Sequence, residues 1–160
     1  MTAACPIGSI IMFGGHTDQL PTGWLYCNGD IVSRKGYEDL FNVIGHNFGN
    51  RIGKLEYDPD RQFFLPDLRG RFVRGVDDGG GRDPDAAQRT DMQSSTPRPG
   101  IGSVQPDALR RHSHEYRRLK WGGDDCSGRV WGHEDVQTGE SGGNETRPLN
   151  AAVYFIIRAS

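Results

Sequence analysis

Residues 21–29 read Pro21-Thr22-Gly23-Trp24-Leu25-Tyr26-Cys27-Asn28-Gly29, a short apolar run between two turns. Pro-Thr-Gly and Asn-Gly are typical of tight turns, and the aromatic residues between them favour a strand. A similar β-prone run covers residues 10–13 and stops at Gly14-Gly15. This part of the chain therefore predicts short strands joined by turns.

One short helix is predicted over residues 37–44. Tyr37, Leu40, Phe41 and Ile44 have the i, i+3, i+4, i+7 spacing of one apolar helix face, and Gly45 follows where a helix should stop. Further strands are predicted at residues 63–65, at residues 69–73 and at residues 153–157. The last of these is a continuous apolar run, which suits a strand buried on both faces.

Composition limits the class of protein. The 160 residues include 23 glycines and 9 prolines, and the net charge is −2. No apolar run approaches the roughly 20 residues that span a bilayer, so no membrane insertion is expected. The weak net charge gives no field for nucleic acid. The composition therefore favours a loop-rich, largely β domain with a thin core, and excludes a helical bundle.

Apolar residues are unevenly distributed. Only 12 of residues 75–148 are large and apolar, whereas residues 149–158 are strongly apolar. The middle stretch cannot offset the entropy of its own ordering. It is therefore either a disordered insert or a segment that packs against other copies of the chain, and its tryptophans and paired histidines favour the second interpretation.

Several motifs occur in a characteristic order along residues 6–85 and 101–158. They are Pro6–Phe13, Pro21–Gly29, Tyr37–Gly45, Phe64–Gly75 and Asn144–Asn150. This order resembles the phage tail collar domain family of short tail fibres and other tail-fibre tips. The resemblance implies a mainly β fold with one short N-terminal α-helix and long irregular loops, in an intertwined homotrimeric tip. It implies a tail-collar-like domain at 1–85 and a Gly-rich trimeric head at 86–160 that ends in the buried C-terminal strand.

His112 and His114 are the metal-ligand candidates. In an extended strand, residues i and i+2 project from the same face about 7 Å apart. Two ligands are too few for a stable site, but a three-fold axis would collect six imidazoles. Residues 107–114 are similar to the Asp-Ala-x-x-x-His-x-His pattern of tail-fibre tips, which implies one structural metal ion per trimer. Six imidazoles suit Zn, Fe or Ni; the alternative is a pair of solvated histidines.

Receptor-binding candidates lie in the Gly-rich segment 116–143. Sugars are held by aromatic faces together with a few placed polar groups, and such groups tend to lie on loops. The candidates are Tyr116, Arg118, Trp121, Arg129 and Trp131. The two tryptophans have an equal alternative role, which is to fill the core of the trimer.

Other clusters favour structural roles. The carboxylates of residues 77–85 lack the calcium-loop spacing, so a solvated, salt-bridged turn is expected. Arg69 and Arg71 are expected to pair with Asp67 or with carboxylates of other copies rather than with phosphate. Cys5, Cys27 and Cys126 are expected to be free thiols, mostly buried; the alternative is one Cys5–Cys27 bridge. No catalytic motif is present, so no catalytic residue is assigned and no enzyme is expected.

The expected function is that of a phage-tail-fibre-type receptor-binding protein, a homotrimeric adhesin for a cell-surface glycan such as lipopolysaccharide. Baseplate or other tail proteins would be its further partners. Its expected location is a virion tail or tail-like particle assembled in the bacterial cytoplasm. Family fibres carry a long shaft before this domain, which begins at residue 6 here. The alternative is therefore a stand-alone lectin-like or toxin-like protein, released without a classical signal peptide. An enzymatic alternative is a polysaccharide depolymerase.

Overall fold

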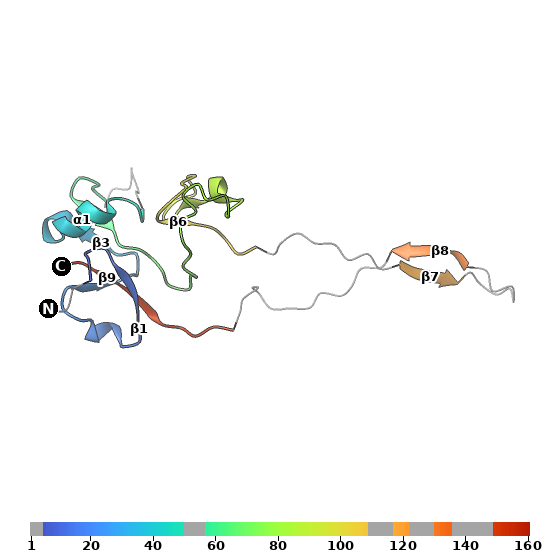
Figure 1. Cartoon of the computed structure of the whole chain (residues 1–160), viewed down its shortest axis with the longest axis horizontal. Helices are drawn as coiled ribbons and strands as arrows, with labels where there is room; N and C mark the ends of the chain where they lie inside the picture. The colour runs from blue at the N-terminus through green and yellow to red at the C-terminus, as the bar shows by residue number, and fades with distance from the viewer. Residues whose placement is uncertain (1–4, 50–56, 109–116, 122–129, 136–148) are drawn as a thin grey trace. The chain divides into compact units, whose positions relative to one another are not determined.

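In the computed structural model, which describes residues 5–49, 57–108, 117–121, 130–135 and 149–160, the last strand lies at the centre of the main sheet. This strand, β9 (Tyr154–Arg158), pairs antiparallel with β1 (Ile10–Phe13) on one side and with β2 (Trp24–Tyr26) on the other (Figure 1). Ile157 lies between Ile10 and Leu25 in this register. The end of the chain therefore closes the sheet that its beginning starts.

The Pro-Thr-Gly turn before β2 fastens the C-terminus. The carbonyl oxygen of Gly23 accepts hydrogen bonds from the amides of Ala159 at 2.7 Å and Ser160 at 3.2 Å. Gly23 has a φ of +81°, and a Cβ there would collide with the carbonyl oxygen of Ser160. Only glycine meets both conditions without strain.

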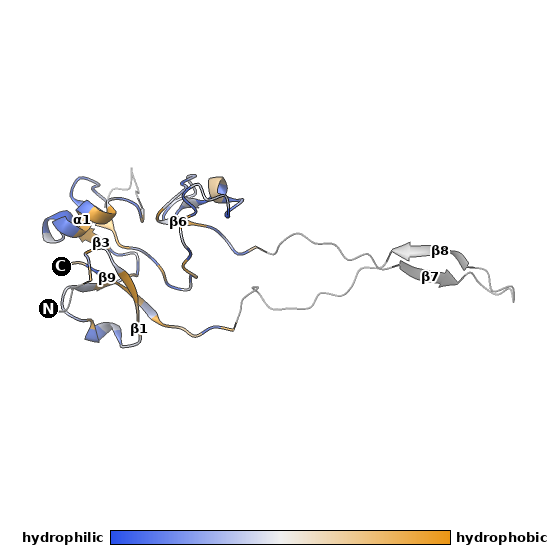
Figure 2. Ribbon diagram, in the orientation of Figure 1, coloured by the Kyte–Doolittle hydropathy of each residue, from blue (hydrophilic) through white to orange (hydrophobic). Residues whose placement is uncertain are grey.

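The helix α1 (Glu38–Ile44) covers one face of this sheet and ends at Gly45, which has a φ of +51°. Its buried residues are Leu40 and Ile44. They belong to a core that joins the helix, β2, β9 and β4 (Gln62–Phe64); its members are Cys27, Leu40, Ile44, Phe48, Phe63, Leu65, Ile157 and Ala159. In Figure 2 the orange colour of hydrophobic residues lies on parts of α1 and on β1, whose Ile10 packs against this core.

Shorter elements complete the first unit, which comprises residues 1–105 and 151–160. β3 (Ile31–Ser33) pairs with β4, and β5 (Thr90–Asp91) pairs with β6 (Ser103–Val104), both antiparallel. Three 3-10 turns lie between these strands: η1 (Thr17–Gln19), η2 (Arg34–Gly36) and η3 (Ala86–Gln88).

Partly buried ion pairs take the place of apolar packing in residues 83–105. The Arg89 guanidinium lies 3.3 Å from the Asp83 carboxylate and donates to the Ser103 hydroxyl at 2.8 Å. The Arg98 guanidinium lies 3.2 Å from Asp91 and donates to the side-chain oxygen of Asn47 at 3.0 Å. Because buried charges are tolerated when they are paired and hydrogen-bonded, this polar network orders a region with little apolar area.

The second unit, residues 106–150, contains the antiparallel pair β7 (Arg117–Trp121) and β8 (Val130–Asp135). The fold is mainly β with one short helix in the described residues, as the sequence predicts. No helix among those residues is both long and apolar enough to cross a membrane. The division of the chain at residue 85 stays a prediction.

One predicted strand is wrong. Residues 69–73 form no strand within the described chain. Residues 69–76 are exposed throughout, and no backbone hydrogen bond in the described parts joins residues 72–76 to a neighbouring strand. The β-prone residues Phe72 and Val73 are present, but no strand of the same described chain lies alongside to pair with them.

Candidate functional site

The predicted metal and receptor residues belong to the second unit. His112, His114, Tyr116 and Arg129 lie outside the described residues. The remaining candidates are on its hairpin: Arg118 and Trp121 are in β7, and Trp131 is in β8. The metal site and the receptor-binding set stay predictions.

The backbone register places the two tryptophan positions at the same end of the hairpin. Trp121 pairs with Val130, next to Trp131, and the register shifts between Lys120 and Trp121. Arg118 pairs with Glu134, nearer the other end of β7. Irregular strand pairing of this kind is common beside functional sites.

Arg69 pairs with Asp67, as expected. Its Nε and one terminal nitrogen each donate to a different carboxylate oxygen at 2.8 Å, which makes a two-pronged ion pair. These hydrogen bonds lower the pKa of Asp67 and raise the pKa of Arg69. The guanidinium of Arg69 is therefore already engaged within the chain, which argues against its binding a phosphate.

The acidic turn is held together by its own backbone. The carboxylate of Asp77 accepts hydrogen bonds from the amides of Gly81 and Arg82, both at 2.8 Å. Asp83 instead pairs with Arg74 and Arg89. Across the described ranges, no three metal-binding side chains come together. The turn therefore has the structural role that the sequence favours.

The cysteine prediction is confirmed in part. Cys5 and Cys27 are both free, so they form no bridge with each other. Cys27 is fully buried, and burial raises the pKa of its thiol to about 12. Cys5 is exposed, so the expected burial is wrong for this residue. Cys126 lies outside the described residues.

An exposed apolar segment follows the Arg69–Asp67 pair. Phe72 is 69% exposed, Val73 59% and Val76 50%. Their backbone belongs to no helix or strand and makes no hydrogen bond to a neighbouring strand in the described chain. Exposed apolar groups in a row are typical of surfaces that another protein covers, and unpaired backbone groups are a template for strand addition.

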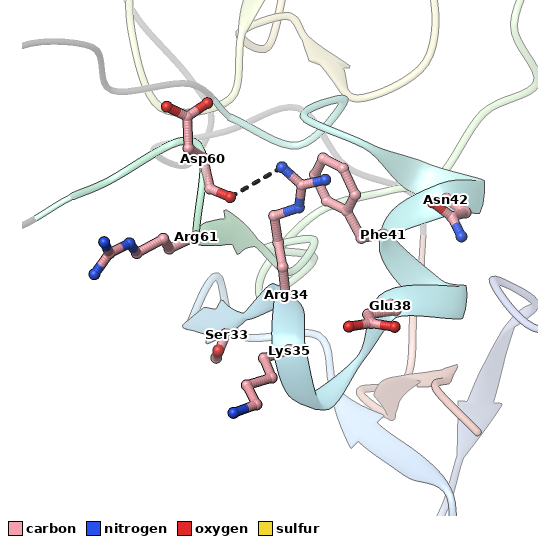
Figure 3. A pocket seen from close by; sticks show the side chains of 8 residues that line it. All are labelled: Ser33, Arg34, Lys35, Glu38, Phe41, Asn42, Asp60 and Arg61. Carbon is pink, nitrogen blue, oxygen red and sulfur yellow. Dashed lines mark hydrogen bonds between the residues drawn. The ribbon is translucent and has the colours of Figure 1, made fainter.

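A pocket of about 660 Å³ lies beside η2 and α1 (Figure 3). Its centre is Arg34, whose guanidinium carbon lies 3.9 Å from the centroid of the Phe41 ring. One terminal nitrogen of Arg34 donates to the carbonyl oxygen of Asp60 at 2.9 Å. Glu38 of α1 and Lys35 of η2 also line the pocket, and neither lies against this guanidinium (Figure 3).

The aromatic wall of the pocket is fixed from behind. The Phe41 ring makes edge contacts with Phe63, at 5.3 Å between centroids, and with His46, at 5.2 Å. The Nδ1 of His46 is 3.1 Å from the hydroxyl of Tyr57. Burial and the positive charges of Arg34 and Arg98 lower the pKa of His46, so its ring is neutral near pH 7. The positive charge of the pocket therefore comes from arginine and lysine.

The sequence alone does not reveal this pocket. Arg34 and Lys35 are adjacent to the predicted helix, but Asp60 lies 26 residues after Arg34 in the chain. The missing signal is β3: once residues 31–33 are recognised as a partner of residues 62–64, Arg34 and Arg61 fall beside each other, because the amide of Arg34 donates to the carbonyl oxygen of Arg61 at 2.8 Å.

Comparison with known proteins finds one family model and two relatives that match this chain. Residues 8–73, which contain β1 to β4 and α1, match the model of the Phage Tail Collar Domain. The chain is 35% identical to Protein RhiB of Rhizobium leguminosarum bv. viciae over 144 residues, which cover 85% of this chain and 64% of RhiB. It is 37% identical over 81 residues to the uncharacterized protein StfE of Escherichia coli (strain K12), which cover 51% of this chain and 35% of StfE. The chain therefore spans less than two thirds of either relative.

Proposed function

We propose that this chain is a homotrimeric adhesin that attaches to a cell-surface glycan. The proposal starts from its membership of the phage tail collar domain family and from its likeness to tail-fibre proteins. The collar family is structural rather than enzymatic, and its members are parts of phage tails. Baseplate or other tail proteins would be the partners at the other end of the assembly. The single observation that carries the proposal is the collar match at residues 8–73.

Self-association is supported by the exposed apolar segment. Phe72, Val73 and Val76 lie at the end of the collar match, exposed beside a core that has few buried residues among those the structure describes. Burying apolar area between copies stabilises an assembly in the same way that it stabilises a domain. Three chains around one axis would cover these groups.

The metal and the glycan belong to the second unit. We place the structural ion, Zn, Fe or Ni, between His112 and His114 of each chain. We place the receptor surface around Trp121 and Trp131, whose positions meet at one end of the β7–β8 hairpin. Each contact with a glycan would be weak, and several contacts on one particle would act together.

The test begins with light scattering of the pure protein, for which a trimer is expected. Metal analysis should then find about one ion per three chains, and His112→Ala should lose it. Binding to whole bacteria is measured with the wild type, with Trp121→Ala and with Trp131→Ala. A monomer would contradict the assembly, a metal-free trimer would remove the histidine site, and undiminished binding by both tryptophan variants would remove the proposed receptor surface.

A further inference from the structure

Arg34 is a positive group that is held in place without a negative partner among the described residues. Its guanidinium is fixed by the face of Phe41 at 3.9 Å and by one hydrogen bond to a neutral carbonyl oxygen, that of Asp60. Within the described residues, no carboxylate lies within ion-pair distance of it. Four of its five N–H donors therefore have no protein acceptor in that part of the chain.

The rim of the pocket adds positive charge. Lys35 and Arg61 both line it (Figure 3). Arg61 lies 3.4 Å from Asp58, but its side chain is 85% exposed, so this pair contributes little and leaves the guanidinium available. An anion in the pocket would therefore meet three cations, Arg34, Lys35 and Arg61, against the two carboxylates of Glu38 and Asp60 in the same lining.

Polar groups of the opposite kind lie on the helix side. Glu38 and Asn42 extend from α1 into the same pocket, one turn apart (Figure 3). A carboxylate and an amide accept hydrogen bonds from hydroxyl groups, and the amide also donates them. The ring of Phe41 adds an apolar wall. The ligand that this lining fits carries one anionic group and several hydroxyls.

We propose that this pocket binds an acidic sugar, with its carboxylate or phosphate on Arg34 and its hydroxyls toward Glu38 and Asn42. The planar guanidinium binds both oxyanions in a two-pronged geometry. The volume of about 660 Å³ accommodates one or two sugar rings. The inference rests on the proposed glycan-binding function but places a second sugar site on the collar unit, apart from the tryptophans of the hairpin.

Binding is measured on the full chain by saturation-transfer NMR with three probes: glucuronate, glucose 6-phosphate and glucose. We expect a signal from at least one acidic sugar and an at least tenfold weaker one from glucose. The two acidic probes distinguish the source of the anion, because one carries a carboxylate and the other a phosphate. Inorganic phosphate is added as a competitor.

Arg34→Gln should weaken binding of the acidic sugar at least tenfold. Arg82→Gln is the matched control, since it removes the same charge from an exposed arginine outside the pocket, and it should bind like the wild type. Should Arg34→Gln fail to fold, Lys35→Gln and Arg61→Gln at the rim should each weaken binding about twofold. Equal binding by glucose, by the Arg34 variant or by both rim variants would overturn the proposal, and so would inorganic phosphate that binds as tightly as the sugar phosphate.

The outcomes separate this site from the proposed function. A chain that binds bacteria through its tryptophans but ignores both acidic sugars would refute the pocket alone. A chain that binds the acidic sugar through Arg34 but binds no bacterial surface would support the pocket and refute the adhesin.

Discussion

Replacing Phe72 with serine should separate the copies of this protein. Phe72 leaves 69% of its surface uncovered within one chain. An enclosed phenylalanine buries roughly 200 Å², so about 140 Å² is available to another copy. At about 25 cal/mol per Å² this area contributes at most about 3.5 kcal/mol per chain, or about 10 kcal/mol per trimer.

A loss of that size lowers the association constant of a trimer by about seven powers of ten. Sedimentation velocity at micromolar concentration should therefore find the wild type near three times 17.7 kDa, about 53 kDa, and the Phe72→Ser variant near one chain mass. Circular dichroism checks that the variant keeps its strands.

The matched control uses two valines of nearly equal exposure. Val73 is 59% exposed in the exposed apolar segment, and Val43 is 57% exposed on α1, whose backbone bonds are made within the helix. Val73→Lys should dissociate the assembly, while Val43→Lys should leave it intact. The reasoning is refuted if Phe72→Ser sediments with the wild type, or if the two lysine variants dissociate equally.

Three smaller predictions concern the collar unit. Gly23→Ala should lower the free energy of unfolding in urea by about 1–3 kcal/mol, because φ is positive at this position and the new Cβ would collide with the C-terminus. Gly36→Ala is the control: its Cβ would enter open space, so the free energy of unfolding should fall far less. Iodoacetamide at pH 8 should modify exposed Cys5 in minutes and spare Cys27, whose buried thiol has a pKa of about 12; equal rates by peptide mass spectrometry would contradict this burial. The carboxyl of Asp67 should titrate by NMR below its ordinary pKa, because its ion pair favours the charged form. The stability that this pair contributes is present above the ordinary pKa and is lost as the pH falls through the lowered value.

Periodic local patterns predict most of the collar elements. The helix at residues 37–44, the strands at 10–13, 24–27 and 63–65 and the buried C-terminal strand all have counterparts within a residue or two. The helix buries Leu40 and Ile44 at helical spacing, and the strands at 63–65 and 154–158 each contain buried apolar residues, so local pattern and tertiary packing agree there.

Two errors share a physical cause. β3 (Ile31–Ser33) has only three residues, which is too short a segment to show the two-residue alternation of a strand. The strand predicted at 69–73 has β-prone residues but no partner strand in the described chain. A strand exists only when its hydrogen bonds are made by a neighbour, and a single sequence does not show which neighbours will be near.

The candidate sites divide in the same way. The pairing of Arg69 with Asp67 is predictable, because the two residues are two positions apart and oppositely charged. The Arg34 pocket is not, because it needs α1 and the β3–β4 pair to approach each other. An ion pair between residues close in the sequence can be predicted from the sequence, whereas a pocket depends on how elements distant in the sequence pack together.

The thin core links these observations. Apolar content too low for a full interior need not leave residues 83–105 without order, because Arg89 and Arg98 anchor them through partly buried ion pairs and hydrogen bonds. Paired buried charges hold a region in place without consuming apolar side chains. The consequence is that the apolar side chains of Phe72, Val73 and Val76 are not drawn inward to cover that region and stay on the surface. Because ion pairs order these loops, the apolar surface of Phe72 is available to another copy of the chain. Dissociation of the Phe72→Ser variant therefore tests the assembly rather than the fold.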